Sequence, residues 1–313
     1  MPKYQLDWKM KLLFWLLSHS SSMVDTDLQK VRSSMNTNSK MRSNILFRPL
    51  RMADIEDRLI PGRHSTIPVR MYRPIQAANL PVVVFFHGGG WALGGLDSHD
   101  AICRRVAVEN RALVVSVDYR LAPEHKYPAA VEDAYDATCW VAEHAPDLGA
   151  SPNKLIVMGD SAGGNLAAVV CLLSRELASP QIAFQVLIYP AVDFGENYLS
   201  KQRYDDTPIL SRQALDYFRD LYIRQPADLK DPHVSPLLAG DLSNLPPALI
   251  LTAEYDPLSD EGNAYADRLR ACGNDVISVC YPGMPHGFLG LGWLGSQTGA
   301  AFAQMKQTLQ QFQ

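Results

Sequence analysis

The stretch LIVMGDSAGGNLAAVV, residues 155–170, places an apolar run directly before a turn of small residues and a helical pattern. The run 155–158 predicts a buried strand, and residues 161–177 predict a helix. The same alternation of strand and helix repeats along most of the chain. It predicts an α/β fold in which a mostly parallel central sheet is covered by helices on both faces.

Around this stretch, the other elements follow from the same patterns. Two strands joined by a turn are predicted at 54–62 and 67–74. Further strands are expected at 81–86, 112–119, 154–159, 184–190, 247–255 and 275–283. Helices are expected at 98–110, 128–145, 161–177 and 257–273, and from about residue 296 onward.

Three segments depart from the alternation. Residues 195–225 form a polar, aromatic, helix-prone insertion. Residues 12–18 predict a short amphipathic helix that covers another part of the protein. Residues 20–44 are rich in Ser, Asn and Thr, and they predict a linker or a loosely held segment.

Composition excludes several classes of protein. The 313 residues carry a net charge of −4, without the basic surplus that nucleic-acid binding usually requires. No run approaches the ~20 apolar residues that span a bilayer.

Lys9 and Lys11 before LLFWLLS resemble the start of a signal peptide, but the apolar run is short and no small-residue cleavage site follows. We expect a cytoplasmic protein, with secretion as the alternative.

Cysteine and histidine patterns give no sign of a metal site. The five cysteines include no CxxC pair, and no HExxH motif occurs. We expect free thiols, with a bridge between Cys272 and Cys280 as the weaker alternative. Neither a metal nor an organic cofactor is expected.

Ser161 is the candidate nucleophile. It lies in Gly159-Asp160-Ser161-Ala162-Gly163, a G-x-S-x-G pattern at the predicted strand-to-helix turn. Such a turn lifts a serine above the sheet, and its strained backbone requires small neighbours. The alternative is that Ser161 only caps the helix.

A serine hydroxyl needs a base to take its proton, and that base needs a partner. His286 follows the strand predicted at 275–283, among turn residues, and is the candidate base. Asp256 ends the preceding strand and is the candidate partner, with Glu254 and Asp260 as rivals. The alternatives are a surface-loop histidine and a carboxylate that caps a helix. The order Ser, Asp, His along the chain is that of α/β-hydrolases.

The glycines of VVVFFHGGGWALGG, residues 82–95, predict an oxyanion hole. Neither GxxxxGK[ST] nor GxGxxG fits them, so a phosphate loop is excluded. Backbone N–H groups here would stabilise the charge that forms when Ser161 attacks a carbonyl. Gly89 and Gly90 are the expected donors, with Gly88 as a further candidate and the N–H of Ala162 completing the set.

Two residues that flank these glycines have expected structural roles. His87 is expected to shape the loop through hydrogen bonds. Trp91 is expected to pack beneath the loop or to line the substrate pocket. Tyr189, Phe194 and Tyr217 are the other candidate pocket residues, with packing as the alternative for each.

Together these motifs resemble the hormone-sensitive-lipase-like family of carboxylesterases, including its bacterial members. The resemblance covers about residues 54–310 and rests on HGGGW (87–91), DYRLAPE (118–124), YPAAVED (127–133), GDSAGGN (159–165), DPL (256–258) and HGF (286–288). It implies the α/β-hydrolase fold, a Ser161-Asp256-His286 triad, and an oxyanion hole of the loop glycines with Ala162. It also implies that Arg120 and Glu124 brace the loops around the site.

The resemblance further implies one domain over residues 1–313. A helical cap would comprise about 1–48 and 195–225, and a catalytic core about 49–194 and 226–313. Family members often pair through the last strand of the sheet, here about 275–281, so a homodimer is a further expectation.

The function these features predict is hydrolysis of short-chain carboxylic esters through an acyl-enzyme. Activity should fall as the pH drops through the range where a histidine gains a proton, ~6.5 for an unperturbed side chain. An amidase or peptidase would use the same residues and remains an alternative. A ligand receptor is a second one, although the receptors of this superfamily lack the histidine that is present here at 286.

Overall fold

The structure is a computed structural model that describes residues 12, 14, 15, 27–35, 50–74, 79–195, 198–291 and 296–312. Its centre is one eight-stranded sheet in the order β1-β2-β4-β3-β5-β6-β7-β8. β2 pairs antiparallel with β1 and β4, and the other neighbours pair in parallel. The strands are β1 (Asp54–Pro61), β2 (Thr66–Arg73), β3 (Leu80–Phe86), β4 (Leu113–Val117), β5 (Ala150–Asp160), β6 (Phe184–Ile188), β7 (Ala248–Tyr255) and β8 (Val276–Pro285).

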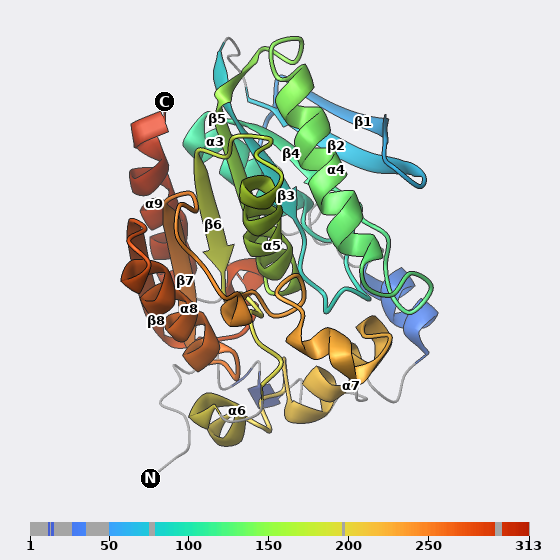
Figure 1. Ribbon diagram of the computed structural model, residues 1–313, viewed down its shortest axis with the longest axis vertical. Helices are drawn as coiled ribbons and strands as arrows, with labels where there is room; N and C mark the ends of the chain where they lie inside the picture. The colour runs from blue at the N-terminus through green and yellow to red at the C-terminus, as the bar shows by residue number, and fades with distance from the viewer. Residues whose placement is uncertain are drawn as a thin grey trace.

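Helices cover both faces of this sheet, which confirms the predicted architecture (Figure 1). One face packs against α4 (Ala129–His144), α5 (Ala162–Glu176) and α8 (Ser259–Ala271), and the other against α3 (Asp100–Asn110) and α9 (Ser296–Leu309). Strand β3 divides its side chains between the two cores, because successive residues point to opposite faces. This is why it reads as an unbroken apolar run.

The parallel strands end at the edge of the sheet where α6 (Leu199–Arg203) and α7 (Arg212–Tyr222) lie (Figure 1). Ser161, Asp256 and His286 are the first residues after β5, β7 and β8, and His87 is the first after β3. The topology thus collects these residues at the edge where open α/β sheets bind ligands. Short 3-10 helices complete the chain at Pro226–Lys230, Pro236–Leu238, Phe288–Leu291 and Gln310–Phe312.

Residues 28–35 are helical, so the expectation of a linker over 20–44 is wrong for this part. The Asp27 carboxylate accepts a backbone N–H of the first turn at 3.1 Å, which caps the helix. Its apolar residues recur on one face and pack into a cluster with α7. They are Leu28, Val31 and Met35. The remainder of 20–44 and most of 12–18 lie outside the described residues.

Arg32 fastens this helix to the catalytic core. Its guanidinium donates to the carbonyl oxygens of Ala92 at 2.8 Å and Ala122 at 2.6 Å, and it pairs with Glu124 at 2.8 Å. Arg120 lies in the same motif as Glu124 but pairs with Asp133 of α4 at 2.8 Å. The two residues therefore contact different parts of the protein.

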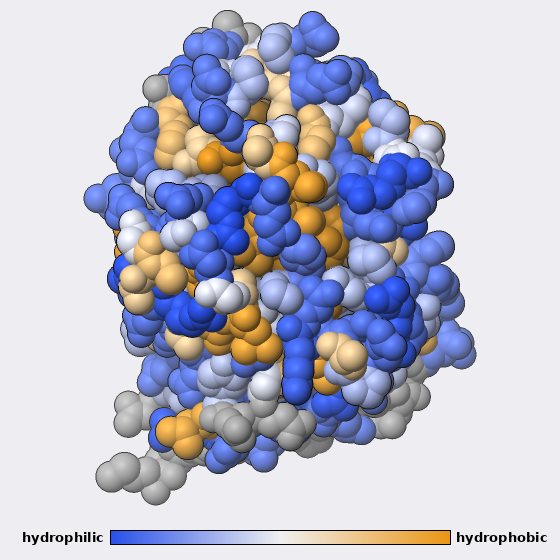
Figure 2. All heavy atoms as spheres, in the orientation of Figure 1, coloured by the Kyte–Doolittle hydropathy of each residue, from blue (hydrophilic) through white to orange (hydrophobic). Residues whose placement is uncertain are grey.

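The surface and the thiols are those of an ordinary globular protein. Hydrophilic residues cover most of the face shown in Figure 2, with apolar residues visible between them.

All five cysteines are free thiols, so no bridge joins Cys272 to Cys280. In the part of the chain that the structure describes, no helix is long and apolar enough to cross a membrane.

Candidate active site

Ser161 stands at a strained turn between β5 and α5. Its backbone has φ +56° and ψ −119°, a region that non-glycine residues rarely adopt. Its N–H donates to the carbonyl oxygen of Ile188 at 2.8 Å, which fixes the turn against β6. A side-chain carbon at Gly163 would collide with the carbonyl of Phe86, so only glycine lets α5 approach β3 this closely. The serine side chain makes no helix-capping hydrogen bond.

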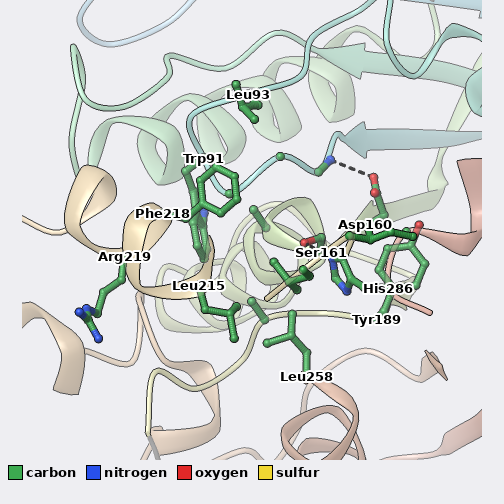
Figure 3. Close-up of a pocket in the computed structure, with 18 of the residues that line it drawn as sticks. Trp91, Leu93, Asp160, Ser161, Tyr189, Leu215, Phe218, Arg219, Leu258 and His286 are labelled. Carbon is green, nitrogen blue, oxygen red and sulfur yellow. Dashed lines mark hydrogen bonds between the residues drawn. The ribbon is translucent and has the colours of Figure 1, made fainter. Parts of the chain in front are cut away.

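Ser161, His286 and Asp256 form one hydrogen-bonded chain. The Oγ of Ser161 lies 2.8 Å from Nε2 of His286, and the two side chains point toward each other in Figure 3. Nδ1 of His286 lies 2.7 Å from Oδ2 of Asp256. The ionised carboxylate can only accept, so Nδ1 carries the proton and Nε2 is free to accept from the serine.

Asp256 is the carboxylate that reaches His286, and its two rivals are engaged elsewhere. Asp256 is fully buried, and its second oxygen accepts the N–H of Leu258 at 2.8 Å. Glu254 accepts the N–H of Gly283 at 2.7 Å, and Asp260 accepts a backbone N–H of α6 at 2.8 Å. Burial with both oxygens hydrogen-bonded holds Asp256 in one orientation.

The glycine loop, residues 87–91, lies beside the Ser161 turn. The N–H of Gly88 donates to Oδ1 of Asp160 at 2.9 Å, the contact drawn as a dashed line in Figure 3. This N–H is therefore already engaged within the protein. Gly89 and Gly90 have φ of +127° and +60°, a region that glycine adopts readily.

Contacts on both sides exclude larger residues from the loop. A side-chain carbon at Gly89 would collide with the backbone of Leu93, and one at Gly90 would collide with the ring of Phe218 on α7. The loop thus places bare backbone between the strand ends and α7, as the approach of a small ligand requires.

His87 shapes the loop in its neutral form. Its Nδ1 donates to the carbonyl oxygen of Gly88 at 2.9 Å, and its ring stacks on Tyr119 with centroids 4.3 Å apart. Burial, and secondarily the nearby charge of His99, lowers the pKa of His87 to about 3. The side chain therefore stays uncharged at neutral pH.

A cavity of about 480 Å³ opens above Ser161. Its floor consists of residues at the strand ends: Gly88 to Trp91 of the glycine loop, Asp160 to Ala162 of the turn, and His286. Its roof consists of residues 28–35, α6 and α7. The roof supplies Met35, Leu215 and Phe218 to the lining, so a segment predicted to be a linker contributes to the site. The spacing of Leu28, Val31 and Met35 is the signal that could have indicated it.

Three of the four candidate pocket residues line this cavity. They are Trp91, Tyr189 and Phe194. Trp91 also stacks on Tyr222 of α7, with ring centroids 4.3 Å apart. Tyr217 is not among the lining residues, and Phe218 takes that place, because adjacent residues of a helix point about 100° apart.

Comparisons with known proteins find similar hydrolases. Residues 83–290 match a protein-family model that is described as the alpha/beta hydrolase fold. The carboxylic ester hydrolase LipN of Mycobacterium tuberculosis is 47% identical over 262 residues, which cover 82% of this chain and 70% of LipN. An ethyl acetate hydrolase of Pseudomonas putida is 41% identical over 252 residues, 79% of each chain.

Solved structures extend the similarity to nearly the whole chain. A hyperthermophilic esterase from the archaeon Pyrobaculum calidifontis superposes with a TM-score of 0.92 at 42% identity, over 97% of both chains. The sheet order, the matched family and these esterase relatives lead to one conclusion. The chain belongs to the hormone-sensitive-lipase-like branch of the α/β-hydrolase fold, and it is a carboxylesterase.

Proposed function

We propose that Ser161 is the nucleophile, His286 the general base and Asp256 the residue that orients His286. The observation that supports this most directly is the unbroken contact from Oγ to Nε2, 2.8 Å, and from Nδ1 to Oδ2, 2.7 Å. Asp256 stabilises the charged imidazole that forms when His286 takes the serine proton.

The oxyanion hole in this proposal is formed by the N–H groups of Gly89, Gly90 and Ala162. Ala162 is the first residue of α5, so its N–H has no acceptor within the helix. Gly88 belongs to the proposed hole in a different role. Its N–H already donates to Asp160, so it fixes the loop and does not bind the oxyanion directly. Donors already in place stabilise the transition state more than the ground state.

The reaction would proceed through an acyl-enzyme. His286 accepts the proton of Ser161 as Oγ attacks the ester carbonyl, and the oxyanion enters the hole. His286 then gives this proton to the departing alcohol. Water attacks the acyl-enzyme with His286 again as base, and the acid leaves as Ser161 regains its proton.

We propose esters with acetyl to hexanoyl chains as the preferred substrates. Aromatic side chains of the floor and the roof close the cavity around the serine and limit the length of the acyl group. They are Trp91, Phe194 and Phe218. A relative at 41% identity is named for ethyl acetate, a short ester of this kind.

The test is hydrolysis of p-nitrophenyl esters from acetate to palmitate by the purified protein, beside Ser161→Ala. We expect a maximum at short chains and a loss on the order of 10⁶-fold in kcat for the variant. If Ser161→Ala kept a tenth of the activity, Ser161 would not be the nucleophile. Faster turnover of palmitate than of butyrate would contradict the short-chain preference.

Two further proposals concern the assembly. We propose that about 1–48 and 195–225 form one cap, because residues 28–35 and α7 pack together above the serine. We also propose a homodimer through β8, which is an edge strand of the sheet. Sedimentation equilibrium would test this, and a monomer at micromolar concentration would contradict it.

A further inference from the structure

A second histidine and a second carboxylate, His99 and Asp160, lie beside the glycine loop, and both line the cavity. Nε2 of His99 is 3.2 Å from Oδ1 of Asp160, the oxygen that also accepts the N–H of Gly88. Nδ1 of His99 is 2.8 Å from the hydroxyl of Ser98, which donates its own proton to the carbonyl oxygen of Gly95 at 2.9 Å. Asp160 is 6% exposed and His99 9%, so water screens this contact poorly.

These contacts can hold His99 as a cation. When the hydroxyl of Ser98 donates to Gly95, it can only accept from Nδ1. An ionised carboxylate can also only accept, so Nε2 donates to Asp160. A histidine that donates from both nitrogens is an imidazolium, and the 3.2 Å contact between His99 and Asp160 is then a buried ion pair.

The surroundings support this assignment. His87, whose ring centroid is 5.5 Å from that of His99, is held neutral, so the two rings do not carry like charges. Burial by itself raises the pKa of Asp160, but His99 and the Gly88 N–H hold it below its usual value. Asp160 is therefore an anion that directly precedes Ser161 in the chain.

An unpaired anion at this place would oppose the reaction. The oxyanion that forms on the substrate is negative and lies next to the same loop, so a bare Asp160 would repel it. The same carboxylate anchors the N–H of Gly88 and thereby sets the orientation of the next two glycines. Its charge must be compensated without breaking that anchor.

We propose that His99 is a positioning residue for ester hydrolysis. Its cation neutralises Asp160 and holds this carboxylate against Gly88, so that the glycine loop presents its N–H groups to the oxyanion. The proposal rests on the proposed role of the glycine loop in binding the oxyanion. No atom of His99 needs to touch the substrate for this effect.

The test compares His99→Gln, Asp160→Asn and the double variant on p-nitrophenyl butyrate. We expect His99→Gln to lower kcat about 10–100-fold with KM changed less than about 3-fold, because the lost term acts on the transition state. Adding Asp160→Asn removes the uncompensated charge while keeping an acceptor for Gly88. The double variant should therefore be at least about 5-fold faster than His99→Gln alone.

A second readout is the rate of inactivation by diethyl p-nitrophenyl phosphate. This reagent phosphorylates Ser161, expels p-nitrophenolate, and places its phosphoryl oxygen where the oxyanion would lie. The inactivation rate should follow kcat across the three variants. His233→Gln is the matched control, since it removes a histidine-carboxylate contact of 3.0 Å, to Glu176, outside the residues that line the cavity.

Several outcomes would overturn the inference. Wild-type kcat in His99→Gln would do so, as would a double variant no faster than the single one, because a merely structural loss is not rescued by neutralising Asp160. If His99→Gln failed to fold, the single Asp160→Asn variant would decide instead. It removes the anion and keeps an acceptor for Gly88, so a loss of more than about 100-fold in kcat and in the inactivation rate would contradict the proposal. Activity retained by Ser161→Ala would mean failure of the proposed function, a result that these variants do not produce.

Discussion

The floor and the roof of the cavity are held in place by different kinds of contact. The floor depends on buried hydrogen bonds and on positive φ angles at Ser161, Gly89 and Gly90. The roof depends on an apolar cluster and on the arginine of helix 28–35 that bonds to two backbone carbonyls. Few residue types satisfy the floor, whereas many apolar side chains would serve in the roof. We therefore expect floor substitutions to change the rate of the reaction and roof substitutions to change the choice of ester.

The largest expected effect within the floor, after loss of the nucleophile, is that of Asp256→Asn. An amide cannot stabilise the charged imidazole and can favour the wrong tautomer of His286, so kcat should fall about 10⁴-fold. Steady-state kinetics on p-nitrophenyl butyrate measures this, with circular dichroism to verify folding. Asp260→Asn is the matched control, because Asp260 bonds to α6 and should stay within about 3-fold of wild type. A variant at position 256 that lost less than tenfold would remove Asp256 from the proposed triad.

Gly90→Ala tests the place where floor and roof meet. The added methyl group meets the Phe218 ring, so the loop must shift and its donors move away from the oxyanion. We expect kcat to fall about 10²–10³-fold, the usual effect of losing an oxyanion donor. Adding Phe218→Ala to Gly90→Ala should raise kcat at least about tenfold, because it removes the ring that the added methyl group meets.

Gly89→Ala provides the contrast for this experiment. Its methyl group meets the backbone of Leu93, which no side-chain substitution can move away. Phe218→Ala should therefore leave the activity of Gly89→Ala unchanged. Equal rescue of both glycine variants would show that Phe218 acts generally on the roof rather than through this contact.

His87 should make the stability of the floor depend on pH. Its pKa is about 3 in the folded protein because of burial, against 6.5 for an ordinary histidine. Between these values the unfolded chain binds a proton that the folded protein does not. The contribution of the neutral His87 to the free energy of unfolding is therefore fully present above about pH 6.5 and is lost as the pH falls toward 3.

Urea unfolding at pH 7 and pH 4.5 measures this contribution. His87→Asn keeps a donor near Gly88 but does not titrate, so its free energy of unfolding should fall about 2–3 kcal/mol less between the two pH values than that of wild type. If the free energy of unfolding fell equally for both proteins between pH 7 and pH 4.5, the burial of a neutral His87 would not be a source of acid sensitivity.

The same difference between floor and roof explains what the sequence could predict. Ser161, Asp256 and His286 each follow a recognisable strand, and parallel strands necessarily end at one edge of the sheet. Their neighbourhood therefore follows from local patterns alone. The glycines of the loop could be interpreted in the same way, since the run follows β3 directly and fits no phosphate motif.

The roof could be predicted only in outline, as a helical cap over about 1–48 and 195–225. Helix 28–35 has only a few apolar residues among polar ones, and its stability depends on packing against α7, which no local pattern reveals. The choice between Tyr217 and Phe218 depends on the rotation of α7 about its axis, which tertiary contacts set. The pair formed by His99 and Asp160 joins residues far apart in sequence, so only the folded arrangement brings it to light.

Tyr217 and Phe218, the two neighbours on α7, allow the test with the smallest expected effect. Phe218 is buried and lines the cavity, whereas Tyr217 packs beside it outside the lining. Phe218→Ala should leave the rate on acetate within a few-fold but raise the hexanoate-to-acetate ratio of kcat/KM about tenfold, roughly the gain from burying one or two more methylenes. Tyr217→Ala should change this ratio less than twofold. If both variants shifted the ratio equally, the roof would act as a whole through its packing, and its individual side chains would not set the length of the acyl chain.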